Sequence, residues 1–127
     1  MKVVNQISSL SNLVCAKCGE SYSIFQPQTY ANCCHQPLVA QYEFPGTFTK
    51  QILCNRPATM WRYKDVLPVF EEEHIVSLGE GMTPILDLSR LRAIYEIPHL
   101  QMKDESKNPT GSFKARGLSA AVSKAKE

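Results

Sequence analysis

The sequence predicts an α/β fold, the start of an α/β domain preceded by a small β segment. From Val76 onward the apolar patterns give the order strand, helix, strand, loop, helix, which is the opening of an α/β unit. Before Phe44, short runs of β-favouring residues alternate with turn residues, and all but one of the cysteines lie there. We therefore expect three regions, at residues 1–44, 45–75 and 76–127.

The composition excludes several classes of function. A net charge of +2 is too small to suggest binding to nucleic acid or to a membrane surface. There is no stretch of about 18 apolar residues and no signal peptide, so we expect neither a membrane span nor secretion. Five cysteines without a secretory signal indicate a reducing compartment, and we expect a cytoplasmic protein whose cysteines are thiols or metal ligands.

The first region reads as a polar, frayed start over residues 1–12 and short strands over 13–44. Cys15-Ala16-Lys17-Cys18, followed by Gly19, has the spacing of half a zinc ribbon. A redox Cys-x-x-Cys would sit at a helix start, and the strand-like residues 22–25 argue against it. Two interpretations stay open, a zinc ribbon and a ribbon that has lost its metal. Pro45-Gly46 predicts a turn and a boundary.

The second region predicts one short helix. Asn55 is placed near its cap, Pro57 at its first position, and Pro68 ends it. Trp61 and Tyr63 are expected in the core or on a docking surface, because aromatic side chains are usually buried.

The third region is assigned element by element. We expect a strand over 76–78, a turn over 79–81, an extended segment over 83–86, a helix capped by Asp87 and closed by Pro98, and a strand over 99–103. A loop over 104–114 then leads into a helix from Phe113 to Glu127, in which apolar residues fall at helical spacing (Leu118, Ala121, Val122 and Ala125).

The loop places one lysine at the start of that helix. Asn108 precedes a proline and is therefore extended, while Gly111 permits close approach of a ligand. Thr110 and Ser112 are both candidate helix caps. Lys114 follows in the first turn, where free N–H groups form an anion site and a cation opposes the helix dipole. A lysine in that setting is of the kind that forms Schiff bases with carbonyl cofactors.

At these residues the chain resembles a known family. Lys103–Gly117, KDESKNPTGSFKARG, closely resembles the cofactor-lysine segment of fold-type II pyridoxal-phosphate enzymes, and within them is most similar to threonine synthases. Val76–Ile85 resembles the family's entry into its catalytic body, and Met60–Tyr63 the helix before it. The resemblance covers roughly residues 13–127.

The resemblance implies a three-layer αβα body, a pyridoxal-phosphate-dependent lyase and a homodimeric parent. Lys114 would hold the cofactor and act in catalysis, and Phe113 would lie against the cofactor ring. The substrate would be the amino acid O-phosphohomoserine, converted with water to threonine and phosphate. Because the last helix carries no stop signal and family members are several times longer, we expect a truncated fragment that is inactive alone.

Two alternatives to threonine synthase remain. One is a sister activity on the same scaffold, such as cysteate synthase or threonine dehydratase. The other is a non-catalytic binding module in which the ribbon contacts a partner; the Cys15-x-x-Cys18 pair supports it only weakly.

The resemblance also bears on the metal. Many threonine synthases carry a second cysteine pair, and on that match Cys34 is retained while Ala31 stands where its partner belongs. The candidate ligands are Cys15, Cys18, Cys34 and His35, with Cys33 as an alternative fourth ligand. Because that fourth position is occupied by Ala31, we expect zinc to bind substoichiometrically or not at all.

The remaining titratable residues carry no predicted chemistry. Asp104 and Glu105 are neighbours on an extended chain and point to opposite faces, so we expect one to bond inward to the loop and the other to be solvated. His74 and His99 are expected to be structural or exposed.

Overall fold

The computed structural model describes residues 6–44, 46 and 49–127. The chain is mixed α and β, and its contacts divide it into two compact units. One unit combines Met1–Arg56 with Tyr63–Glu73, and the other combines Pro57–Arg62 with His74–Glu127. Pro45, half of the predicted turn, lies outside the described residues. In the described part of the chain, every helix is too short or too polar to span a membrane.

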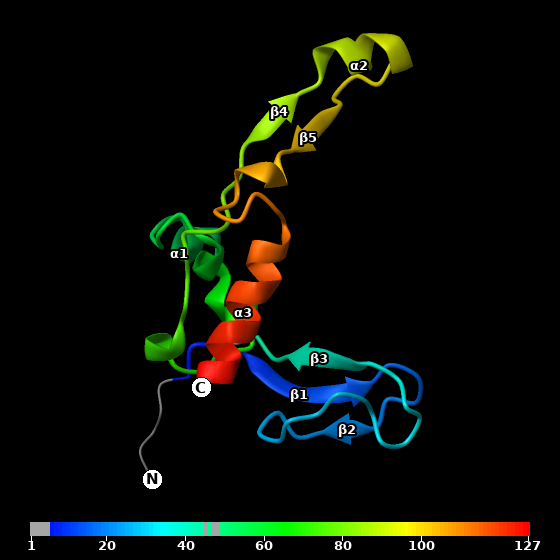
Figure 1. Cartoon of the computed structure of the whole chain (residues 1–127), viewed down its shortest axis with the longest axis vertical. Helices are drawn as coiled ribbons and strands as arrows, with labels where there is room; N and C mark the ends of the chain where they lie inside the picture. The colour runs from blue at the N-terminus through cyan, green and yellow to red at the C-terminus, as the bar shows by residue number, and fades with distance from the viewer. Residues whose placement is uncertain (1–5, 45, 47–48) are drawn as a thin grey trace. The chain divides into compact units, whose positions relative to one another are not determined.

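The first unit contains a three-stranded antiparallel sheet, as the β-favouring runs predict. Its strands are β1 (Leu10–Cys15), β2 (Ser21–Tyr22) and β3 (Leu38–Tyr42), in the order β2-β1-β3 (Figure 1). The central strand β1 pairs Cys15 with Leu38 and Val14 with Ser21, so the cysteine turns lie at one end of the sheet.

The prediction of a frayed start is wrong for residues 6–12. Ile7 N–H donates to the Phe70 carbonyl at 2.9 Å, and Ser9 N–H donates to the Asp65 carbonyl at 2.8 Å. Ser8 is buried, and its hydroxyl donates to the Leu67 carbonyl at 2.5 Å. Polar composition misleads here because the backbone of this segment pairs with residues 65–70 and the Ser8 hydroxyl bonds to a carbonyl of the same segment.

The segment before Met60 differs from its prediction. Helix α1 (Lys50–Cys54) precedes it, begins at the N-cap Thr49 and ends at Asn55, so Asn55 closes a helix instead of opening one. The predicted helix is the 3₁₀ segment η1 (Met60–Val66), interrupted at Tyr63 by non-helical backbone. Trp61 is buried as expected, while Tyr63 is 42% exposed. A second 3₁₀ turn, η2, spans Glu72–His74.

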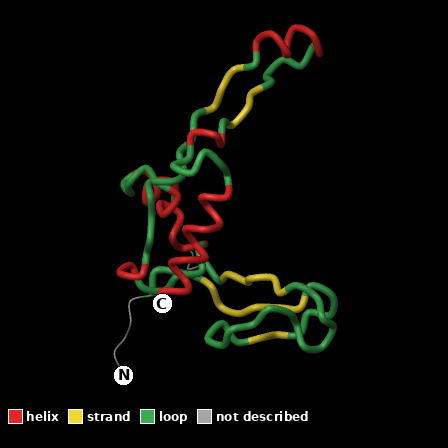
Figure 2. The backbone as a smooth tube through the Cα atoms, in the orientation of Figure 1, coloured by secondary structure: helices red, strands yellow, loops and turns green. Residues whose placement is uncertain are grey.

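The second unit contains β4 (Ile85–Asp87), α2 (Ser89–Tyr95), β5 (Gln101–Lys103), the 3₁₀ turn η3 (Glu105–Lys107) and α3 (Lys114–Lys126). Figure 2 shows α3 as a continuous helix at the end of the chain. Its predicted position is confirmed to within one residue at each end.

Two details of this unit correct the predictions, and the pairing of its strands was not predicted. The described residues 76–78 form no strand. Strands β4 and β5 pair antiparallel, because the segment between them doubles back and Leu88 N–H bonds to the Leu100 carbonyl at 3.2 Å. Asp87 ends β4 and does not cap α2; its carboxylate accepts a hydrogen bond from Arg92 at 3.0 Å.

The buried face of α3 is made of small residues. Ala115, Ser119 and Ser123 are buried, whereas Leu118 and Val122 are 58% and 50% exposed. Ser119 Oγ donates to the Val76 carbonyl at 2.7 Å, and Ser123 Oγ accepts from Val76 N–H at 2.8 Å. The backbone at Val76 is therefore satisfied by helix side chains instead of a neighbouring strand.

Candidate cofactor-lysine site

The loop before α3 is organised around the carboxylate of Glu105. The Arg116 guanidinium donates to it twice, from Nε to Oε2 and from Nη2 to Oε1, each at 2.8 Å. Parallel hydrogen bonds between a planar guanidinium and a carboxylate fix both distance and orientation. Because Arg116 lies in the first turn of α3, this pair ties the start of the loop to the start of the helix.

Two further side chains complete the carboxylate's shell. Thr83 Oγ1 donates to Glu105 Oε1 at 2.6 Å, and Asn108 Nδ2 donates to Glu105 Oε2 at 2.9 Å. Asn108 is almost fully buried, and its Oδ1 accepts from Gly81 N–H at 3.1 Å. The network thus joins the loop to the segment over residues 81–83.

Of the neighbouring carboxylates Asp104 and Glu105, Glu105 is the one that points inward, and its hydrogen-bond partners are mainly side chains. Asp104, beside it, accepts from the backbone N–H of Ser106 at 3.1 Å and from the Ser106 hydroxyl at 2.5 Å. The Arg116 guanidinium, with help from the Thr83 hydroxyl, holds the pKa of Glu105 well below its ordinary value. Glu105 is therefore charged at neutral pH and acts as a fixed acceptor.

The sequence pattern indicates no role for Arg116, Thr83 or Glu80. The sequence did contain a local signal for the ion pair, because Glu105 lies at the start of the loop and the oppositely charged Arg116 lies in the first turn of the helix that follows. The part played by Thr83 depends on a contact distant in sequence and left no local pattern.

A second carboxylate, which is buried, supports the same unit. Glu80 is 1% exposed and accepts hydrogen bonds from Trp61 Nε1 at 3.2 Å and from Leu78 N–H at 2.8 Å. Burial raises the pKa of Glu80, but hydrogen bonds from hydroxyl and backbone N–H groups outweigh it, and the net pKa lies below the ordinary value. The carboxylate is thus stabilised chiefly by hydrogen-bond donors.

A close backbone approach follows Glu80. Its carbonyl accepts from Met60 N–H at 2.8 Å, and a Cβ on Gly81 would lie 2.5 Å from that same Met60 nitrogen. Gly81 also has φ +106°, which L side chains rarely adopt. Only glycine suits this position.

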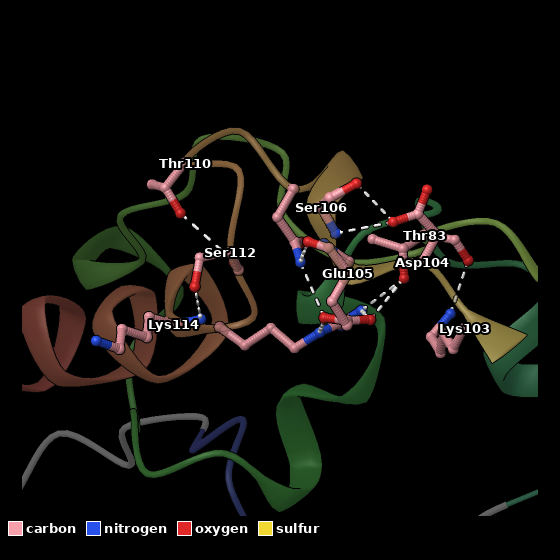
Figure 3. A network of polar contacts seen from close by, with 11 residues as sticks. Thr83, Lys103, Asp104, Glu105, Ser106, Thr110, Ser112 and Lys114 are labelled. Carbon is pink, nitrogen blue, oxygen red and sulfur yellow. Dashed lines mark hydrogen bonds and ion pairs between the residues drawn. The ribbon is translucent and has the colours of Figure 1, made fainter.

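Lys114 begins α3 and extends away from the Glu105 network, as Figure 3 shows. Its backbone N–H donates to Ser112 Oγ at 3.3 Å, so of the two predicted caps it is Ser112 that bonds to the helix start. Thr110 instead donates to the Ser112 carbonyl at 3.4 Å. In the part of the chain that the structure describes, the Lys114 ammonium has no hydrogen-bond or ion-pair partner.

Lys114 and Phe113 suit a cofactor that binds an amine through its carbonyl group. Lys114 offers an exposed primary amine, and Phe113 beside it is 66% exposed, which leaves its ring available to lie against a flat group. The helix start is a weaker anion site than its position predicts. The N–H groups of Ala115 and Arg116 already bond to the carbonyls of Ser112 and Phe113, each at 3.2 Å.

An apolar pocket of about 180 Å³ lies beside this helix. It is lined mostly by apolar side chains, with Glu80 and Ser119 among its few polar ones (Val76, Leu78, Glu80, Thr110, Ala115, Leu118, Ser119 and Val122). Leu118 and Val122, predicted on helical spacing, face this pocket.

Four of the cysteines of the first unit also come together. The sulfurs of Cys15, Cys18, Cys33 and Cys34 all lie within 4.8 Å of one another. This group contains Cys33 and does not contain His35. The backbone N–H of Cys18 and of Lys17 lower the pKa of Cys15 to about 7, whereas hydrogen bonding with the Cys18 thiol raises the pKa of Cys34.

Comparison with known proteins agrees with the resemblance seen in the sequence. Residues 76–127 match the family described as pyridoxal-phosphate dependent enzyme. The chain is 37% identical over 116 residues to a threonine synthase of Methanocaldococcus jannaschii, covering 89% of this chain and 28% of that protein. It is 34% identical over 117 residues to a threonine synthase of Methanosarcina acetivorans, covering 91% of this chain and 28% of that protein.

A threonine synthase of Halalkalibacterium halodurans is 46% identical over 74 residues, covering 54% of this chain and 21% of that protein. The chain therefore spans less than a third of the length of the relatives it matches. No solved structure matches it significantly. Residues 76–127, which contain the Glu105 network and Lys114, match the pyridoxal-phosphate-dependent enzymes, and the chain is threonine synthase-like over most of its length.

Proposed function

We propose that this chain supplies the cofactor-lysine segment of a threonine synthase, which converts O-phosphohomoserine and water to threonine and phosphate. The observation that carries the proposal is the Lys114 amine. It has no partner in the described part of the chain and follows a loop fixed by Glu105 and Arg116. That loop lies in the region that matches the pyridoxal-phosphate family.

Pyridoxal phosphate supplies an electron sink for carbanions of amino-acid substrates. Lys114 would hold it covalently through Nζ and, as a free amine, would carry a proton at that atom. Phe113, which is 66% exposed, would lie against its ring. Ser112 and Thr110 order the turn by bonding to the backbone, at 3.3 Å to Lys114 N–H and at 3.4 Å to the Ser112 carbonyl.

The Glu105 network positions Lys114 without touching the reacting atoms. Arg116 is anchored through both Nε and Nη2, so the first turn of α3 has a fixed position relative to the loop. A reactive group held in this way needs less ordering when the substrate binds, and a small misplacement can lower the rate by orders of magnitude.

A chimera tests the proposal. Residues of this chain would replace the matching segment in the Methanocaldococcus jannaschii threonine synthase, and phosphate release from O-phosphohomoserine would be measured. Borohydride reduction followed by peptide mapping should find the pyridoxyl group on Lys114. Lys114→Ala should abolish turnover, whereas Lys107→Ala, an exposed lysine in the same loop, should retain it.

Several results would contradict the proposal. Cofactor on Lys103 or Lys107 would show that the lysine is misassigned. Turnover of other amino-acid substrates but not of O-phosphohomoserine would indicate a sister activity, such as a cysteate synthase or threonine dehydratase. The 127-residue chain alone is expected to be inactive. Homodimerisation and a cytoplasmic location, which the family resemblance implies, stay predictions.

A further inference from the structure

The two cysteine turns share one backbone hydrogen-bond pattern. In the first, Gly19 N–H donates to the Cys15 carbonyl at 3.0 Å, and Cys15 N–H donates to the Glu20 carbonyl at 2.8 Å. In the second, His35 N–H donates to the Ala31 carbonyl at 2.8 Å, and Ala31 N–H donates to the Gln36 carbonyl at 2.9 Å.

The backbone angles agree with this correspondence. Gly19 has φ 79° and His35 has φ 50°, so each second cysteine is followed by a residue with positive φ. By these bonds and angles, Ala31 takes the place of Cys15, and Cys34 takes the place of Cys18. His35 takes the place of a turn glycine, which explains why its side chain is not part of the sulfur cluster.

Ala31 therefore occupies a ligand position without a ligand. It is 0% exposed, and its counterpart Cys15 is 2% exposed. The position is buried in both turns, but only the first turn carries a sulfur there.

Cys33 supplies the missing sulfur from a different position in the turn. Its Sγ lies 3.4 Å from Cys18 Sγ, and its backbone N–H donates to the Tyr22 hydroxyl at 3.1 Å. Adjacent side chains on a strand point to opposite faces, but residues 32–34 form a turn, in which neighbouring side chains can converge. Cys33 and Cys34 both reach the cluster for this reason.

We propose that Cys15, Cys18, Cys33 and Cys34 form a tetrathiolate zinc site in which Cys33 has replaced the ligand lost at Ala31. A tetrahedral ion with metal–sulfur distances of about 2.3 Å requires sulfurs about 3.8 Å apart. The four sulfurs, all within 4.8 Å of one another, approach that spacing. Lys17 N–H also donates to Cys15 Sγ at 3.4 Å, the type of bond that stabilises a ligating thiolate.

This inference differs from the metal-free ribbon that the sequence favours. The sequence pattern shows that the expected position is lost but cannot show that a neighbour reaches the same point in space. The site also lies where it can hold the sheet, because β1 ends at Cys15 and β3 begins at Leu38.

Zinc content of the full chain, purified under reducing conditions without chelators, tests the proposal. We expect one zinc per chain in the wild type and at least a tenfold lower content in Cys33→Ala. The double variant Ala31→Cys/Cys33→Ala should regain one zinc, because it returns the sulfur to the position equivalent to Cys15. Cobalt substitution should give the strong sulfur-to-metal charge-transfer bands of thiolate ligation in the wild type and in the double variant.

Two variants serve as controls. His35→Ala should keep its zinc, since His35 lies outside the cluster. Cys54→Ala should also keep it, because Cys54 is an exposed cysteine elsewhere in the chain. The proposal is overturned by a wild type without zinc, by zinc loss in His35→Ala, or by a Cys18–Cys33 disulfide in the reduced preparation. Failure of the double variant to regain zinc, with circular dichroism like that of the wild type, would overturn the ligand replacement.

Discussion

The Glu105 carboxylate and the Arg116 guanidinium form a bidentate pair with both hydrogen bonds at 2.8 Å. The pair closes the loop that ends at Lys114, and both side chains are about 30% exposed or less. Lysine cannot replace Arg116 here, since an ammonium presents no planar fork. In the proposed enzyme, Arg116→Lys should therefore lower kcat more than it raises the KM for O-phosphohomoserine, because it disturbs the position of Lys114 and not the substrate's own contacts.

The pair also predicts a pH dependence of stability. The folded pKa of Glu105 lies below its ordinary value of about 4.3, so the stability it contributes is present above that pH and is lost as the pH falls below it. Urea unfolding measured between neutral pH and about pH 3 should show this loss in the wild type. Glu105→Gln should be less stable at neutral pH and should show a flatter acid limb. Glu96→Gln, at an exposed site, controls for the removal of one charge; equal acid limbs in the wild type and Glu105→Gln would contradict this assignment.

Gly81→Ala should be strongly destabilising. The positive-φ backbone costs a non-glycine residue about 1–3 kcal/mol. The overlap of the new Cβ with the Met60 backbone, at 2.5 Å, adds about 1–3 kcal/mol. Thermal unfolding followed by circular dichroism measures the sum.

Gly117→Ala is the matched control for that prediction. Gly117 lies within α3, and a Cβ there meets nothing within 4 Å. Alanine should stabilise the helix by about 0.8–1.0 kcal/mol. If both alanine variants changed stability in the same direction, the close approach at Met60 would not be the cause.

Trp61 reports on the buried carboxylate of Glu80. It is the single tryptophan in the chain, and its Nε1 donates to Glu80 Oε1 at 3.2 Å. Because the pKa of Glu80 is lowered, the fluorescence of Trp61 should stay constant down to about pH 4.3 and change only below it. Glu80→Gln should remove that change. A fluorescence transition near neutral pH would be inconsistent with this account. Trp61→Phe should lower the free energy of unfolding by about 1–3 kcal/mol, since it removes a hydrogen-bond donor from a buried carboxylate.

The sequence could predict the local elements and not the contacts that join them. Helix α3 was predictable from its spacing, and the strands of the first sheet from their composition. The antiparallel pairing of β4 and β5 was not, because an apolar run does not encode the direction of its partner. The strand expected at residues 76–78 failed because Ser119 and Ser123, which hydrogen-bond to Val76, come from more than forty positions later in the sequence.

The residues of the candidate site divide in the same way, into those that local sequence predicts and those whose roles depend on distant contacts. Lys114 was singled out by its position between a glycine-serine loop and a helix, which is local information. Arg116 and Thr83 were missed because their roles depend on Glu105, whose direction in the loop could not be read from the sequence. In the cysteine cluster, the loss at Ala31 was visible locally, but the approach of Cys33 to Cys18 was not.

The segment from Ile85 to Lys103 should be the first part of the second unit to open. Strand β4, helix α2 and strand β5 contain no buried residue, and Ile85 and Ile94 are 63% and 61% exposed. With little apolar surface buried, the hydrogen bonds of this hairpin are protected only by local structure, whose opening costs little free energy. Helix α3, in contrast, has three buried residues and hydrogen bonds to Val76. Limited trypsin digestion should therefore cut first after Arg90 or Arg92, and amides over 85–103 should exchange with deuterium well before those over 115–123.

Arg90→Gln/Arg92→Gln should delay the first cut without altering the exchange pattern, because it removes the cleavage sites and leaves the hairpin's low stability unchanged. Initial cleavage inside α3, or slower exchange in the hairpin than in α3, would show that the hairpin is stabilised by contacts other than those described.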